Sequence, residues 1–104
     1  MSKVDRAAVF AALGEPIRLQ LLDQLGERRS ISQLAKDLPI SRQAVTQHLR
    51  VLERSRLIES HRSGRETHFV ARPDRLVEAK SWLDDVTQQW DNTLARLKRF
   101  AEEK

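Results

Sequence analysis

Apolar residues recur along most of this chain at spacings of three and four, which is the pattern of one buried face on an α-helix. The first such segment covers residues 3–13 and is followed by Gly14, which suits the end of a helix. The second begins at Pro16, where a missing N–H does no harm, and ends at Gly26. The chain is therefore predicted to open with two helices.

The next segment predicts a helix-turn-helix over about residues 33–55. Ser30-Ile31-Ser32 could form a short strand, and Ser32 is expected to cap the helix that follows. Pro39 ends that helix, and Ser41 can cap the next one by accepting a hydrogen bond from a free amide one turn on. Two capped helices joined by a short turn form a helix-turn-helix.

The second helix of this pair, residues 41–54, has two contrasting faces. Its apolar face consists of Val45, Leu49 and Leu52. At 100° per residue, the opposite face carries Gln43, Gln47, Arg50 and Arg54, with no acidic group among them. Amides pair bidentately with adenine, and guanidinium groups pair with guanine or phosphate. This face therefore favours DNA binding in the major groove, although a solvated surface is the simpler interpretation of one isolated helix.

A β-hairpin is predicted within residues 57–71, where two β-capable runs flank Ser63 and Gly64. The glycine supplies the positive φ that such a turn needs. Arg62 and Arg65 flank the tip and give the hairpin a basic end. A basic hairpin directly after a helix-turn-helix is typical of a winged helix, in which the wing reaches the DNA backbone or the minor groove.

The last element is predicted to be a long helix over about residues 75–101, roughly 40 Å in length at 1.5 Å per residue. Its apolar positions are Leu76, Ala79, Leu83, Val86, Trp90, Leu94 and Leu97. Trp82 and Phe100 widen this stripe. The rest of the chain is too small to cover it, so part of the stripe is expected to pair with another chain, as a/d seams do. The alternative is a helix that packs wholly on its own domain.

Composition limits the class of protein. The chain has 104 residues, which predicts a single domain over residues 1–104. Such a domain has a modest core, so burial of further apolar surface in an oligomer interface would add to its stability. Hydrophobic residues make up 39% and charged residues 33%, and there is neither a transmembrane run nor a signal-peptide core, so a cytoplasmic location without membrane contact is expected. The absence of cysteine excludes disulfides and thiolate chemistry.

The positive charge is concentrated in the helix-turn-helix and wing. The chain carries a net charge of +4, and residues 41–72 hold seven arginines against three glutamates. Such a cluster is the electrostatic footprint of polyanion binding. Arg28 and Arg29, which lie outside it, are expected to be solvated rather than to reach a phosphate.

Three segments resemble the ArsR-type winged-helix transcription regulators. They are Ala12-Leu13-Gly14-Glu15-Pro16-Ile17-Arg18, residues 41–52, and Gly64-Arg65-Glu66-Thr67-His68-Phe69. The resemblance implies a mainly α fold with a small β-hairpin, in the order helix, helix, short strand, helix, helix, strand, strand, helix. It also implies a homodimer held by the first and last helices, and operator binding that usually represses transcription. The expected interface residues are Phe10, Leu76, Leu83, Val86, Trp90, Leu94 and Leu97.

Many relatives of this type sense metals, and this sequence departs from them. The family's cysteine-containing box corresponds here to residues 32–38, which offer no soft ligand. In the last helix, where other members use histidines, the only potential metal ligands are carboxylates. All three histidines of the chain lie in the recognition helix and the wing: His48, His61 and His68. Transition metals require clustered imidazole or thiolate donors, so neither a metal site nor a cofactor is expected.

No enzymatic site is evident in the sequence, since there is neither a nucleophile–base pair nor a phosphate-binding loop. Trp82 and Trp90 could line a pocket for a small-molecule inducer, although core packing is the favoured interpretation. His48 is expected to pack or to touch a phosphate rather than to act as a sensor.

The sequence thus predicts a dimer that binds double-stranded DNA at an inverted repeat, with recognition helices about 34–36 Å apart. We expect Gln43, Thr46 and Gln47 to contact base edges and Ser41 and Arg50 to contact phosphates, while Arg42 could contact either. The wing contact is expected from Arg62, Gly64 and Arg65. The alternative is a winged-helix module that binds another protein through the last helix and has no need of a Gln/Arg face free of acids.

Overall fold

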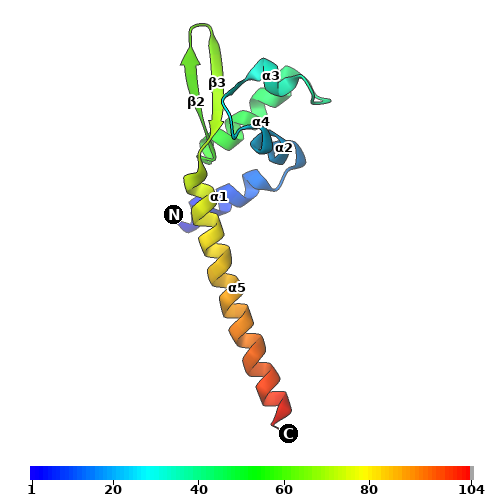
Figure 1. The fold of residues 1–104 in the computed structure, drawn as a ribbon, viewed down its shortest axis with the longest axis vertical. Helices are drawn as coiled ribbons and strands as arrows, with labels where there is room; N and C mark the ends of the chain where they lie inside the picture. Colours follow the sequence, from blue (N-terminus) through cyan, green and yellow to red (C-terminus); the bar gives the residue numbers. More distant parts are fainter. Residues whose placement is uncertain (104) are drawn as a thin grey trace.

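The computed structural model describes residues 1–103 and has the predicted order of elements, a mainly helical fold with a β-hairpin wing (Figure 1). The elements are α1 (Lys3–Leu13), α2 (Pro16–Gln24), β1 (Arg29–Ser30), α3 (Ile31–Ala35), α4 (Arg42–Arg54), β2 (Ile58–Ser63), β3 (Glu66–Ala71) and α5 (Pro73–Glu102). None of the helices formed by residues 1–103 has the length and apolar character needed to cross a bilayer.

Helix α4 supplies the centre of the core. Its predicted apolar face is confirmed, because Val45, Leu49 and Leu52 are each 0% exposed. Residues from every other element except β1 join them in one cluster, and the buried set is completed by Val9, Ala12, Leu21, Leu25, Leu34, Leu57, Ile58, Phe69 and Ala79. With its inner face fixed in this way, α4 must present its polar face outward.

The third helix is capped differently from the prediction. Ser30, not Ser32, is its N-cap: the Ser30 hydroxyl accepts from the Gln33 N–H at 3.2 Å, and the Gln33 side chain accepts from the Ser30 N–H at 2.8 Å. This reciprocal pair is a capping box. The preceding strand is displaced accordingly to Arg29–Ser30, where Arg29 pairs with Phe69 of β3. The Arg29 Nε donates to the Gln24 carbonyl at 2.7 Å, so Arg29 is not simply solvated as expected.

The wing is an antiparallel sheet of order β1-β3-β2. Ser63 pairs with Glu66, so the hairpin loop consists of Gly64 and Arg65 rather than the expected Ser63 and Gly64. Gly64 has φ +63° and Arg65 does not have positive φ, which is the pattern of a type II′ turn. The loop therefore places Arg65 at the very tip of the wing.

Helix α5 begins at Pro73, crosses α1, and then extends beyond the rest of the protein (Figure 1). At the crossing, the Trp82 ring lies 5.4 Å from the Phe10 ring and 4.8 Å from the Arg6 guanidinium carbon. Trp82 is therefore packed within its own chain, in agreement with the core packing that the sequence favours for it. The radius of gyration is 18.8 Å, against about 13 Å for a compact chain of this length.

Ionic contacts fasten the start of α1 to the start of α5. The Arg75 guanidinium lies 3.9 Å from the Asp5 carboxylate and 3.6 Å from Glu78, which also contacts the amino terminus at 3.5 Å. A hydrogen bond from the Ser2 side chain, aided by the charge of Arg75, lowers the pKa of the Asp5 carboxyl below its ordinary value. These contacts stabilise the angle at which α5 leaves the domain.

Arg56 adopts a left-handed conformation at the end of α4, with φ 62°. Its N–H donates to the Glu53 carbonyl and the Leu57 N–H donates to the Leu52 carbonyl, both at 3.0 Å, which is the Schellman pattern that glycine favours. An L side chain in this region costs about 1 kcal/mol.

Changing Arg56 to Gly is therefore expected to raise the free energy of unfolding by about 0.5–1 kcal/mol in urea denaturation. The matched control is Arg54→Gly, the same substitution in right-handed helical backbone, which should lower that free energy by about 1 kcal/mol. A loss of stability in both variants would show that the Arg56 side chain contributes more than its backbone strain costs.

Candidate nucleic-acid interface

The outer face of α4 is the candidate interface. Ser41 caps the helix as predicted, its hydroxyl accepting from the Ala44 N–H at 3.1 Å. Gln43, Gln47 and Arg50 are exposed on the outer face, as is Arg54. The predicted direction of these side chains is thus confirmed, whereas their contacts with DNA remain a prediction.

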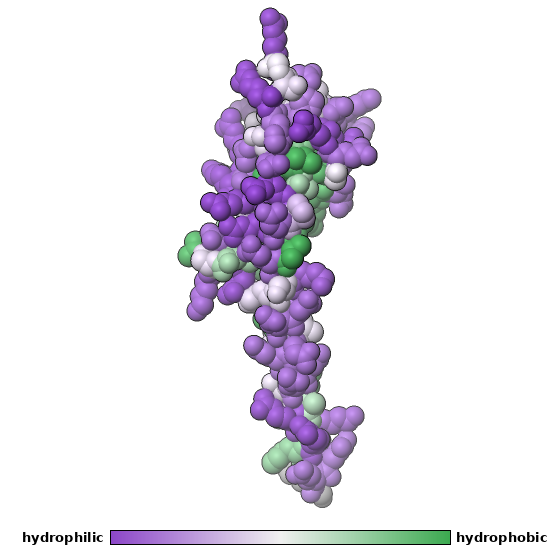
Figure 2. Space-filling model, turned by 60° about the vertical axis from the view of Figure 1, so that its left-hand side comes forward, coloured by the Kyte–Doolittle hydropathy of each residue, from purple (hydrophilic) through white to green (hydrophobic). Residues whose placement is uncertain are grey.

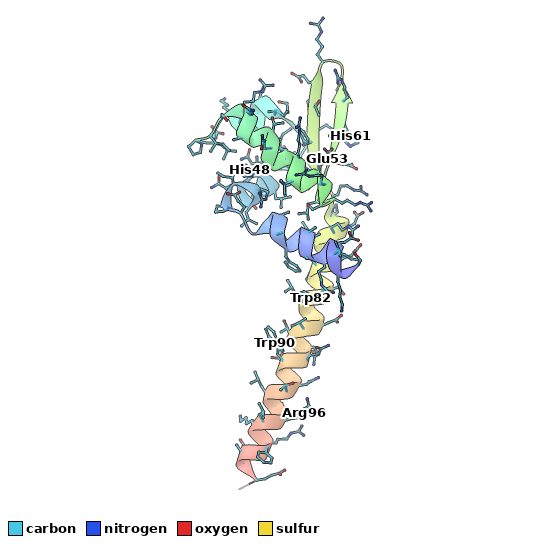
Figure 3. All side chains as sticks on the ribbon, turned by 180° about the vertical axis from the view of Figure 1, so that it is seen from behind. His48, Glu53, His61, Trp82, Trp90 and Arg96 are labelled. Carbon is cyan, nitrogen blue, oxygen red and sulfur yellow. The ribbon has the colours of Figure 1, made fainter. Side chains whose placement is uncertain are left out.

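The one carboxylate on α4 is held away from this face. Glu53 accepts a hydrogen bond of 2.5 Å from the Ser60 hydroxyl on β2. Figure 3 shows Glu53 near the base of the wing, on the same side as His61. The contact joins α4 to the hairpin and leaves the outer face with amides and guanidinium groups only, a composition that suits base edges and phosphates.

Thr46 is more restricted than the sequence indicated. The residue is half-buried, and its hydroxyl donates to the Arg42 carbonyl at 3.0 Å. The hydroxyl hydrogen is therefore already used within the helix. Thr46 retains its oxygen lone pairs and its methyl group, so it can accept from a base donor or contact a thymine methyl.

The wing carries the other predicted contacts. Arg62, Gly64 and Arg65 are all exposed. Alternate residues of a strand share a face, so Arg62 lies on the same side of the sheet as Ser60, the residue that contacts α4. Arg65 lies in the loop at the far end of the hairpin from that contact. The wing and α4 therefore offer two separate sets of basic groups.

A groove of about 350 Å³ runs along the flank of α4 that faces α2. It is lined by Arg18, Gln47, His48, Arg50, Val51 and Arg54. The His48 Nδ1 lies 3.3 Å from the Arg18 Nη1 and 3.7 Å from the Glu15 carboxylate. Figure 3 shows His48 between α4 and α2.

Three of the polar residues that line this groove, Arg18, His48 and Arg54, were not assigned to the interface from the sequence. Arg54 could have been, because it lies on the outward face by helical spacing. For His48 the sequence predicts either packing or a phosphate contact. Arg18 gave no local signal, because it is 30 residues from His48 in the chain and the two meet only in the folded protein.

The predicted interface residues of α5 form an exposed apolar stripe. The exposed fractions are 37% for Leu76, 47% for Leu83, 66% for Trp90, 63% for Leu94 and 59% for Leu97. Val86 is half-buried, and Phe10 packs on Trp82 as described. In Figure 2 green and pale-green patches interrupt the hydrophilic surface along the protruding part of α5. Pairing with a second chain through this stripe remains a prediction.

The histidines of the wing do not converge on a common ligand. His61 and His68 are paired across the strands, but each is in contact with its own carboxylate, Glu59 at 3.0 Å and Glu66 at 3.1 Å. Within residues 1–103, no group of three or more His, Cys, Asp or Glu side chains is arranged to hold a metal ion.

The chain is similar in sequence and in fold to known transcription regulators. A helix-turn-helix domain family matches residues 13–61. The uncharacterised HTH-type transcriptional regulator YuzN of Bacillus subtilis is 35% identical over 89 residues, which are 77% of this chain and 97% of that protein. The transcriptional repressor SdpR, also of Bacillus subtilis, is 28% identical over 83% of this chain and 97% of its own length.

A solved structure extends the similarity to nearly the whole chain. The ArsR-like transcriptional regulator from Rhodococcus sp. RHA1 is 38% identical, superimposes with a TM-score of 0.90, and covers 97% of this chain and 94% of its own. That coverage includes the helix-turn-helix, the wing and the long last helix. The chain therefore belongs to the ArsR family of winged helix-turn-helix transcriptional regulators.

Proposed function

We propose that the protein is a dimeric transcriptional repressor that binds an inverted-repeat operator, with α4 of each copy in the major groove. The observation that carries this proposal is the outer face of α4, where amides and guanidinium groups are exposed and the one carboxylate of the helix is engaged with Ser60. A helix with a diameter of about 10–12 Å, side chains included, fits the major groove, which is about 12 Å wide. SdpR, a relative over most of the chain, is a transcriptional repressor.

In this proposal the residues divide by chemistry. Gln43 and Gln47 read base edges, and Thr46 contributes its acceptor or its methyl group. Ser41 and Arg50 bind phosphates, and the exposed Arg42 binds either a phosphate or a base edge. The whole chain then acts as one winged-helix DNA-binding unit.

The second copy is proposed to cover the apolar stripe of α5. Leu76, Leu83, Trp90 and Leu97 recur every seven residues, which is the repeat of a coiled-coil seam. Large apolar side chains at this spacing are costly to leave in water, because burial stabilises each by about 1.5–3 kcal/mol. Pairing through α5 and α1 would give the two-fold symmetry that an inverted-repeat operator requires.

We also propose that this family member responds to a signal other than a transition metal. The chain contains no cysteine, and its three histidines lie in α4 and the wing. The donor chemistry for a soft metal is thus missing from the chain itself. A small organic inducer at the α5 seam, with Trp90 among its contacts, is the alternative signal.

A gel shift with the region upstream of the protein's own gene tests the function. Specific binding there, resistant to excess random DNA, would support a repressor that controls its own transcription. A protein-interaction module would give no shift on this region or on its flanking sequences. Footprinting of the shifted complex should reveal two protected half-sites with centres about one helical turn apart.

Arg65→Ala tests the wing contact. Because Arg65 lies at the tip of the hairpin, the variant is expected to weaken binding to all DNA sequences. The slope of log affinity against log salt concentration should fall by about 0.9, the value of one phosphate contact. Arg28→Ala, which removes an exposed arginine from the α2–β1 turn, is the control. An Arg65→Ala slope equal to that of the unaltered protein would refute the contact.

A further inference from the structure

The groove between α2 and α4 is strongly basic. Three guanidinium groups and one imidazole line it, from Arg18, Arg50, Arg54 and His48. The Glu15 carboxylate, which lies 3.7 Å from the His48 Nδ1, already accepts a hydrogen bond of 2.9 Å from the Arg18 backbone N–H and caps α2. The groove therefore has an excess of positive charge and favours an anion.

Arg18 is held in place by the end of α1. Its Nε donates to the Ala12 carbonyl at 2.6 Å, and its Nη2 donates to the Ala11 carbonyl at 3.1 Å. Its Nη1 lies 3.3 Å from the His48 Nδ1. A guanidinium group has five N–H donors, so donors on both terminal nitrogens remain for a ligand. Because the side chain is already ordered, binding an anion costs little further side-chain entropy.

His48 supplies a second donor beside Arg18. A guanidinium group can only donate, so the hydrogen bond between the Arg18 Nη1 and the His48 Nδ1 requires the imidazole tautomer that carries its proton on Nε2. The imidazole is half-buried and lines the groove. Its Nε2–H is therefore available to an acceptor that enters the groove.

The position of the groove indicates which anion this is. A helix that fills the major groove has a sugar-phosphate strand along each flank. The basic groove lies on the α2 flank of α4 and shares Gln47 and Arg50 with the outer face. We propose that Arg18 and His48 bind one phosphate of the DNA backbone beside the recognition helix. This inference rests on the proposed DNA binding and adds to it His48 of α4 and Arg18 of α2, of which Arg18 lies outside the helix-turn-helix and the wing.

Such a contact would position α4. Arg18 belongs to α2, its side chain donates a hydrogen bond to the end of α1, and it contacts His48 of α4. One phosphate bound there would therefore engage three helices together. The phosphate would thereby fix the rotation of α4 about its axis and set which base edges Gln47 meets.

The test uses a duplex of arbitrary sequence, because phosphate contacts do not depend on sequence. Affinity is measured by fluorescence anisotropy over a range of salt concentrations. Arg18→Met is expected to lower the salt slope by about 0.9 and the affinity about tenfold at low salt. His48→Phe removes a neutral donor, so affinity should fall about three- to tenfold with an unchanged slope.

Two controls separate this role from a structural one. Arg28→Met makes the same change at an exposed arginine outside the groove and should leave the affinity nearly unchanged. Arg18→Lys keeps the charge without the fixed guanidinium, so the slope should return while the affinity recovers only in part. Circular dichroism and thermal melts establish that each variant is folded before its DNA binding is compared.

Three outcomes would overturn the inference. One is an Arg18→Met slope equal to that of Arg28→Met, and another is a His48→Phe affinity equal to that of the unaltered protein. The third is Arg18-dependent binding of inorganic phosphate that leaves the duplex bound at constant ionic strength, which would identify a small-anion pocket that DNA does not enter. Failure of the proposed function is distinct, because the unaltered protein would then bind no duplex.

Discussion

Changing Leu83 and Trp90 together to Glu is expected to convert the protein from a dimer into monomers, as measured by light scattering. Both side chains are exposed in the single chain, at 47% and 66%, so the substitution should leave the winged-helix core intact. In the proposed dimer both positions lie in the α5 seam. Burying a carboxylate without a partner costs several kcal/mol, more than a small interface tolerates.

The same variant should lose operator binding. A dimer binds its second half-site as an intramolecular event, which raises affinity about 100-fold or more over a single copy. The matched control is Ser81→Glu with Gln88→Glu, which adds the same charges at the same spacing on the opposite face of α5. A dimer that survives the Leu83 and Trp90 changes would place the interface elsewhere.

Gln47→Ala is expected to weaken operator binding by about 1–3 kcal/mol, or roughly five- to 150-fold. The side chain is exposed on the outer face of α4 beside the basic groove, where an amide can pair bidentately with adenine. The variant should also tolerate changes at one base pair of each half-site, because that base would no longer be read.

The measurement compares affinity for the operator with affinity for a random duplex. Gln47→Ala should affect the first and leave the second nearly unchanged. Gln20→Ala, an exposed glutamine on α2 outside the groove, is the control and should alter neither. Equal losses on both duplexes would mean that Gln47 contacts the backbone rather than a base.

Much of the fold could be predicted because it depends on local chemistry. Ser41 is a good N-cap, and Val45, Leu49 and Leu52 must share a face at helical spacing, so both the helix and its direction follow from the sequence. The same spacing gave the apolar stripe of α5. Family membership confirms the prediction that the protein is a transcription regulator and not an enzyme.

The predictions that were wrong, the cap of α3 and the position of the hairpin loop, depend on contacts between residues that are far apart in the sequence. Ser30 and Ser32 are both able to cap a helix. Ser30 is the cap because it is the last residue of β1, where it pairs with His68 of β3, and α3 begins directly after it. Likewise, the register of β2 on β3 moved the hairpin loop by one residue, to Gly64 and Arg65.

The candidate site shows the same limit. Arg18 meets His48 only because α2 packs against α4, and no local pattern in the sequence reports such a contact. Thr46 is assigned to base edges from the sequence, but its hydroxyl hydrogen is already donated to the Arg42 carbonyl. The sequence therefore predicts the polar outer face of α4 but not the side chain of α2 that lies beside it.

The protruding half of α5 has a consequence for the lifetime of the protein. Every residue from Thr87 to Glu103 is exposed in the single chain, and a helix that stands alone is only marginally stable in water. We expect a partner copy to supply the missing stability, so that the thermal midpoint rises with protein concentration. A scarce, newly made chain would then offer a fraying end to proteases, while an abundant one would be protected. Turnover would thus depend on abundance.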